Sequence, residues 1–144
     1  DEGASVLSVN AVAPGIDEAK TLTGMVSNLS TLVQAPLCLN SSSPEALESA
    51  LRVYPGRALI HSVSCEEVKL QNILPIAAKY GAAFMLLPVE EAGVPGEAGE
   101  RIRIIQRVFS EAQKYGYTRS DFLVDGLVMT IATNQASMET LMHI

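Results

Sequence analysis

The sequence lacks several features that point to particular classes of protein. It has ten lysine and arginine residues against sixteen acidic ones and no basic run, which argues against nucleic-acid binding. No apolar stretch approaches the roughly 20 residues of a membrane span, and no charged and then apolar leader opens the chain. Its two cysteines, Cys38 and Cys65, are too few for a disulfide framework or a zinc knuckle, and we expect both to be small buried hydrophobic residues. These absences predict a cytoplasmic globular protein without nucleic acid, membrane or metal as a partner.

The sequence does contain enough apolar material for one folded core. Hydrophobic residues make up 48% of its 144 residues and the mean hydropathy is +0.23, which fits a single domain over residues 1–144. The chain begins at Asp1 without an initiator methionine, and its last residues resemble an unfinished helix. We therefore interpret the 144 residues as an excerpt of a longer protein.

A strand-like stretch followed by helical spacing of apolar residues recurs five times along the chain. The predicted strands cover residues 6–11, 37–41, 58–62, 82–89 and 122–128. Helices are predicted over residues 17–33, 44–54, 65–80 and 97–115, and from about residue 135 onward. Ser43 and Pro44 are typical of a helix start, and Ser64 with Glu67 forms a capping box for the third helix. For the helix over 97–115, the expected buried stripe is Ile102, Ile105, Val108, Phe109 and Ala112.

Strands that are apolar on both faces and alternate with helices indicate an α/β fold with a parallel sheet. Two architectures remain open. An open, doubly wound sheet is complete with five strand–helix units. A (β/α)8 TIM barrel needs roughly 250 residues, so five units would form only a partial barrel. In both architectures, ligands bind where the strands end.

Polar residues gather at those strand ends. Because side chains alternate along a strand, Ser8 and Asn10 share one face, and Cys38 and Asn40 do the same. Four strands thus finish in a polar side chain, and serines follow closely; these residues are Asn10, Asn40, His61 and Asp125, then Ser41, Ser43, Ser62 and Ser64. The pattern predicts a ligand site along this edge of the sheet.

Most of these residues also have a structural explanation. Helix capping alone accounts for Ser43, and asparagines such as Asn10 and Asn40 are common turn formers at strand ends. His61 is equally compatible with an interior histidine whose hydrogen bonds are satisfied. Asp125 is different, because a carboxylate inside the apolar stretch "FLVDGLV" is costly to bury without a partner. Contact with a ligand is therefore the stronger interpretation for Asp125.

Four stretches of the chain follow a known pattern: "EGASVLSVNAVAP", "LCLNSSSPEALESALRVYPGRALIHSVS", "YGAAFMLLPVEEAGVP" and "FLVDGLV". In order and spacing they resemble the pterin-binding barrel of the methyltetrahydrofolate:corrinoid methyltransferases, which include the folate domain of cobalamin-dependent methionine synthase. The "YPGRALIHS" step is the most specific element, and the related dihydropteroate synthases match less well. The resemblance covers nearly the whole chain and implies a TIM barrel of which strands two to six are present.

The resemblance also implies which residues hold the pterin ring. In the family, strand-end carboxylates and amides accept hydrogen bonds from the amino and ring N–H groups of the pterin. The implied pterin-binding residues are Asn10 and Asp125, as in the family, with Ser8 and Asn40 in place of aspartate, Ser43 and His61 in place of asparagine, and Ser62 beside them. Losing two such acceptors would weaken binding by about two to four decades.

The implied activity is transfer of a methyl group from methyltetrahydrofolate, or a related pterin, to a corrinoid such as cobalamin. That cofactor would be carried by a corrinoid protein or cobalamin-binding domain as partner, and the barrel itself would need no metal. The residue that the family links to the pterin N5 atom would lie beyond Ile144, so no catalytic residue is assigned here.

Two alternatives stay open. One is a degenerate, non-catalytic barrel homologue that serves as a binding or docking module. The other is a self-contained open-sheet binding domain, against which the sequence shows neither an Asp-x-His-x-x-Gly corrinoid motif nor a glycine-rich phosphate loop. A partial barrel would leave two sheet edges open, so we expect either more chain or a second copy, as a homo-oligomer, to cover them.

Overall fold

The computed structural model describes residues 3–128, 140 and 142–144, which contain one five-stranded sheet. All neighbouring strands are parallel and lie in chain order: β1 (Leu7–Asn10), β2 (Leu37–Asn40), β3 (Leu59–Val63), β4 (Ala83–Leu86) and β5 (Phe122–Val124). An open sheet of the doubly wound type would reverse its order at a switch point. The unbroken order confirms the prediction of a barrel segment.

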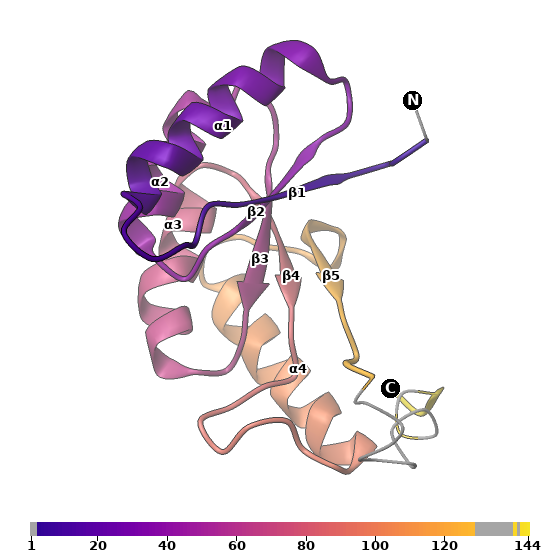
Figure 1. The fold of residues 1–144 in the computed structure, drawn as a ribbon. Coiled ribbons are helices and arrows are strands. Elements are labelled where there is room, and N and C mark those ends of the chain that lie inside the picture. Colours follow the sequence, from indigo (N-terminus) through magenta and orange to yellow (C-terminus); the bar gives the residue numbers. More distant parts are fainter. Residues whose placement is uncertain (1–2, 129–139, 141) are drawn as a thin grey trace.

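The helices cover one face of this sheet (Figure 1). They are α1 (Glu18–Leu32), α2 (Pro44–Val53), α3 (Leu74–Lys79) and α4 (Ala98–Gln113), each following one strand. The core between the two layers contains one residue from each of the strands β1 to β4, which pair in one row: Val9, Leu39, Ile60 and Phe84, all at most 2% exposed. We call this covered side the outer face and the opposite side the inner face. No helix within the described residues is long and apolar enough to cross a membrane.

The segment between β3 and α3 differs from the predicted capping box. Ser64 does not cap the helix, because its hydroxyl donates to the carboxylate of Glu66. The backbone N–H of Glu67 donates instead to Oε1 of Glu91, at 2.7 Å. The first turn is therefore capped by a side chain from the loop after β4, 24 residues further along the chain.

The same helix is also less regular than predicted. A π-helical turn, Lys69–Ile73, precedes α3. Pro75 lies in the first turn of α3 and has no N–H to donate, and its ring would clash with the carbonyl four residues earlier in a continuous α-helix. The wider turn just before it removes that conflict.

Other helix and strand boundaries also differ from the predicted ones. Strands β4 and β5 are shorter than predicted, and the helix expected from about residue 135 lies almost entirely outside the described residues. In α4, Ile102 and Ile105 are only half-buried. The buried stripe is instead Arg101, Ile104, Val108 and Ala112. Val108 and Ala112 are buried as predicted, whereas Phe109 is half-buried like Ile102 and Ile105. The prediction was wrong for these three because Arg101 occupies a buried position that apolar spacing does not indicate.

The "YPGR" stretch braces the amino ends of the strands. The hydroxyl of Tyr54 accepts the N–H of Leu37, the first residue of β2, at 3.1 Å. Arg57 donates to the carbonyl of Gly81 at 3.0 Å and to Asp121 at 2.7 Å, just before β4 and β5 respectively. A Cβ on Gly56 would lie 3.1 Å from two ring carbons and the hydroxyl oxygen of Tyr54, so glycine lets the turn pack against that side chain. The first four residues of the "YPGRALIHS" element therefore hold the sheet at its amino end, and the last two, His61 and Ser62, lie at the end that carries the predicted site.

We expect the brace to make stability depend on pH. Hydrogen bonds from Thr118 and then Arg57 lower the pKa of Asp121 from its ordinary 3.8 to about 2. A carboxylate with a lowered folded-state pKa stabilises the fold above its unfolded pKa, and that contribution is lost as pH falls from about 4 to about 2. Chemical denaturation between pH 2 and 5 measures how the free energy of unfolding depends on pH. This free energy should fall less steeply with decreasing pH for Asp121→Asn than for the wild type. Equal slopes would show that ionisation of Asp121 does not contribute to folding stability.

The inner face, which no helix covers within the described residues 3–128, should drive association. Leu123 is 56% exposed on this face, and a cavity of about 260 Å³ opens nearby between Val6, Leu59 and Ala83. Exposed apolar surface beside two open strand edges favours pairing with further chain. We expect the isolated 144 residues to sediment as oligomers or aggregates. A stable monomer whose β1 and β5 amides exchange slowly with solvent would contradict this expectation.

Candidate functional site at the carboxyl ends of the strands

Three of the predicted site residues lie side by side in the sheet. Asn10 pairs in register with Asn40, and Asn40 with His61. Met85 and Leu123 continue the same row across β4 and β5. The row lies on the inner face of the sheet, and each of the strands β1 to β3 contributes one polar side chain to it near the end of the strand. We call Asn10, Asn40 and His61 the polar row.

The polar row is accessible. Asn10 is exposed, and Asn40 and His61 are half-buried. Oδ1 of Asn10 accepts the N–H of Val12 at 2.8 Å, so this asparagine does form a turn at the strand end. That bond uses the carbonyl oxygen, so the amide nitrogen is the group that can donate to a ligand.

One step earlier along the strands, Ser8 pairs in register with Cys38. Burial raises the pKa of Cys38, and the neighbouring Ser8 opposes this shift only in part. The thiol is therefore neutral at ordinary pH. Both cysteines are buried and free, as predicted, and the described residues contain no group of three potential metal ligands.

Asp125 lies just beyond the end of β5 and not inside a strand. Its N–H donates to the carbonyl of Leu86 at 3.0 Å, which extends the ladder by one bond. Its Oδ1 accepts the N–H of Leu127 at 2.9 Å, and the residue is exposed. The expected cost of burying this carboxylate does not arise, because the strand ends before it and solvent reaches it.

The serines of this edge serve several structural roles. Ser43 is the N-cap of α2, as predicted, and its hydroxyl accepts the N–H of Ala46 at 3.2 Å. Ser41 is buried, and its oxygen accepts the N–H of Ser43 at 3.0 Å. Ser62 is also buried, at 9% exposure, so it is less accessible than its neighbour His61.

Each loop at this edge is bonded to the next one. Ser41, after β2, donates to Glu18 at the start of α1, and Lys69 donates to Ser42 at 3.2 Å. The loops after β3 and β4 are joined by the bond between the Glu67 N–H and Glu91 described above. The loops after β4 and β5 are joined by Arg101. These four contacts fix the positions of the loops around the polar row and Asp125.

Sequence reasoning missed Arg101. Its side chain belongs to α4 and is 1% exposed, and its guanidinium donates to the carbonyls of Pro95, Gly126 and Leu127 at 2.6–2.8 Å. A buried arginine cannot be recognised from apolar spacing. The signal that could have found it is the "GVPGEAGER" stretch, in which a turn before the helix is followed by an arginine in its first turn.

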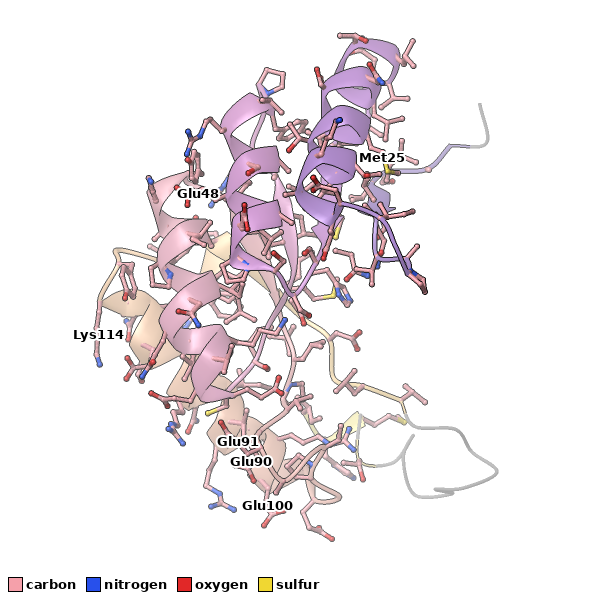
Figure 2. All side chains as sticks on the ribbon, turned by 60° about the vertical axis from the view of Figure 1, so that its left-hand side comes forward. Met25, Glu48, Glu90, Glu91, Glu100 and Lys114 are labelled. Atoms are coloured by element: carbon pink, nitrogen blue, oxygen red, sulfur yellow. The ribbon has the colours of Figure 1, made fainter. Side chains whose placement is uncertain are left out.

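A second hollow lies against α4. It has a volume of about 220 Å³ and is lined by Cys65, Glu90, Glu100, Arg103, Ile104 and Arg107. Figure 2 shows Glu90 and Glu100 at the same end of the molecule, beside Glu91. The opposite charges partly pair, as in the 3.4 Å contact of Arg103 with Glu100, and burial raises the pKa of the Cys65 thiol. None of the predicted site residues lines this hollow.

Comparison with known proteins finds a matching family and two similar relatives. A sequence model of the family described as "Pterin binding enzyme" matches residues 1–144. The chain is 29% identical over 140 residues to the methionine synthase of Mycobacterium tuberculosis, covering 93% of this chain and 12% of that protein. It is 28% identical over 140 residues to the methylcorrinoid:tetrahydrofolate methyltransferase of Eubacterium limosum, covering 95% of this chain and 51% of that protein.

Solved structures with the same fold include two dihydropteroate synthases. That of Stenotrophomonas maltophilia superposes with a TM-score of 0.73 at 16% identity, over 95% of this chain and 56% of that chain. That of Yersinia pestis, solved with a pterine–sulfa conjugate, gives 0.75 at 17% identity, over 96% and 57%. The chain thus spans about half the length of these structures, and the fold is a partial TIM barrel.

The role of Ser43 can be tested by substitution. Replacing an N-cap serine with alanine removes the acceptor for a backbone N–H and costs about 1 kcal/mol of stability. We expect Ser43→Ala to lower the free energy of unfolding by about this amount, and Ser43→Asp to retain it because aspartate caps equally well. Urea denaturation of the three proteins measures both effects. Equal losses in the two variants would mean that the capping bond is not what the serine contributes.

Proposed function

Because this chain belongs to the pterin binding enzyme family, we propose that it is part of a methyltransferase acting on methyltetrahydrofolate or a related pterin. The methyl acceptor is a corrinoid cofactor on a partner protein or domain. The proposal draws on two relatives whose names state methionine synthesis and methyl transfer between a methylcorrinoid and tetrahydrofolate. It places the chain in one-carbon metabolism.

The observation that carries the proposal is the polar row together with Asp125. Asn10, Asn40 and His61 stand next to one another on the inner face, and the carboxylate of Asp125 is exposed where β5 ends. A pterin ring carries an amino group and ring N–H groups beside carbonyl and ring-nitrogen acceptors. Amide and carboxylate oxygens can accept from the former, while amide and imidazole N–H groups can donate to the latter.

His61 could offset part of what the replaced residues lose. The family has asparagine at this position, and a neutral imidazole likewise offers one donor and one acceptor. Ser8 and Ser43 offer hydroxyls where the family has aspartate and asparagine. Since the Ser43 oxygen already accepts from Ala46, its hydroxyl hydrogen is the part that a ligand can use. Ser62 completes the proposed set beside His61.

The chemistry requires orientation and proton control. Nitrogen N5 must gain positive charge before its methyl group can leave, so the site has to hold the pterin and support a proton or a hydrogen bond there. When the partner is bound, its corrinoid supplies the cobalt that accepts the methyl group. The residues of this chain bind and orient the ring in this scheme, and no catalytic residue is assigned among them.

Binding measurements test the proposed site. In titration calorimetry of the intact protein with methyltetrahydrofolate, Asp125→Asn and His61→Ala should each weaken affinity by about tenfold or more, because each removes a hydrogen-bond partner of the ring. His61→Asn restores the family residue and should retain affinity. Asp121→Asn is the matched control, since this carboxylate lies at the opposite end of β5 and should leave affinity unchanged.

Two results would reject the proposal. Variants of Asp125 and His61 that lose thermal stability but keep affinity would assign these residues a structural role. A wild-type protein that binds no pterin would favour the runner-up, a degenerate non-catalytic barrel that serves as a binding or docking module. The departures at Ser8 and Asn40 support that alternative. In that case the double variant Ser8→Asp with Asn40→Asp, which restores the family's carboxylates, should gain pterin affinity.

A further inference from the structure

Arg101 is the most deeply buried charged side chain in the described part of the chain, at 1% exposure. Its Nε donates to the carbonyl of Pro95 at 2.8 Å, in the loop that precedes its own helix. Its Nη1 donates to two carbonyls beyond β5, Gly126 at 2.6 Å and Leu127 at 2.8 Å. Hydrogen bonds from a charged donor are shorter and stronger than neutral ones. One guanidinium therefore joins the loop after β4 to the turn after β5.

The turn that Arg101 holds is the one that carries Asp125. Leu127 has a φ of +58°, a left-handed conformation that is unfavourable for a bulky side chain. Its N–H donates to Oδ1 of Asp125, and its carbonyl accepts from Arg101. The carboxylate and the guanidinium are thus linked through the two polar groups of a single strained residue.

We propose that Arg101 is a positioning residue that fixes the Asp125–Leu127 turn and thereby the direction of the Asp125 carboxylate. Without the two bonds from Nη1, Leu127 would relax towards negative φ and its N–H would leave the carboxylate. The side chain of Asp125 would then no longer be held in its present direction beyond the end of β5. The importance of this for ligand binding rests on the proposed function, whereas the positioning itself does not.

Lysine cannot replace arginine in this role. A guanidinium places Nε and Nη1 in a fixed plane, so it reaches Pro95 on one side and the turn on the other. A lysine ammonium keeps the charge but is a single point on a flexible stem, and it cannot hold both loops in the same geometry. Arg101→Lys therefore keeps the positive charge of the side chain and removes only its planar geometry. Arg103→Lys is the matched control, because Arg103 lies on the same helix but is exposed.

Amide hydrogen exchange of the intact, ligand-free protein tests the positioning. Arg101→Lys should speed exchange of the Leu127 N–H by about tenfold or more, with little change at Leu37 in the amino-end brace. Arg103→Lys should change neither. Adding Leu127→Gly to Arg101→Lys should restore slow exchange at position 127, since glycine adopts positive φ without strain. Unchanged exchange at Leu127, or equally faster exchange throughout the sheet, would overturn the proposal.

Affinity provides the second readout. Arg101→Lys should weaken methyltetrahydrofolate binding by about tenfold, and this loss should disappear in an Asp125→Asn background because both changes act through the same carboxylate. Independent, multiplying losses would overturn a role through Asp125. If the wild type binds no pterin, the proposed function fails, while the ligand-free exchange result still decides whether Arg101 positions the turn.

Discussion

The in-register pairing of parallel strands is the constraint on which the candidate site depends. Asn10, Asn40 and His61 are separated by about 20 to 30 residues in the chain, and only the ladder brings them next to one another. A shift of one residue in any of these strands would turn its polar residue towards the helices and an apolar residue towards the inner face. The outer row, which includes Leu39 and Ile60, prevents such a shift because it fills the core.

The amino and carboxyl ends of the strands have different roles. At the amino ends, Tyr54 and Arg57 bond to the segments that lead into β2, β4 and β5, and Tyr117 donates to the carbonyl of Ala82 at 2.8 Å. At the carboxyl ends, side chains join neighbouring loops and leave polar groups accessible. In barrels of this kind the amino end serves stability and the carboxyl end serves ligands. Tyr54 and Arg57 therefore serve the amino end of the sheet and lie outside the candidate site.

Local sequence patterns were sufficient to predict the order of elements, the N-cap at Ser43 and the face that the residues of the polar row share. Each depends on residues close in sequence, or on the alternation that every strand obeys. The errors concern contacts between distant segments. The cap at Glu67 comes from Glu91, and Arg101 is buried because carbonyls from two loops surround it. Glu91 cannot be predicted from the sequence around Glu67, and Gly126 and Leu127 cannot be predicted from the sequence around Arg101; only Pro95 is local to this arginine. Asp125 was misplaced for a related reason, since the end of β5 depends on where β4 stops pairing.

The sequential strand order also governs how the chain can be assembled. Each strand pairs with the one synthesised just before it, and every helix is made between two strands that become neighbours. Contacts of short sequence separation form faster than distant ones because less chain entropy is lost in closing each loop. A ribosome releases the chain from its amino end, so each strand–helix unit can dock on a surface that already exists. When the sheet grows in this manner, the strand formed last offers its open edge for pairing with the next strand.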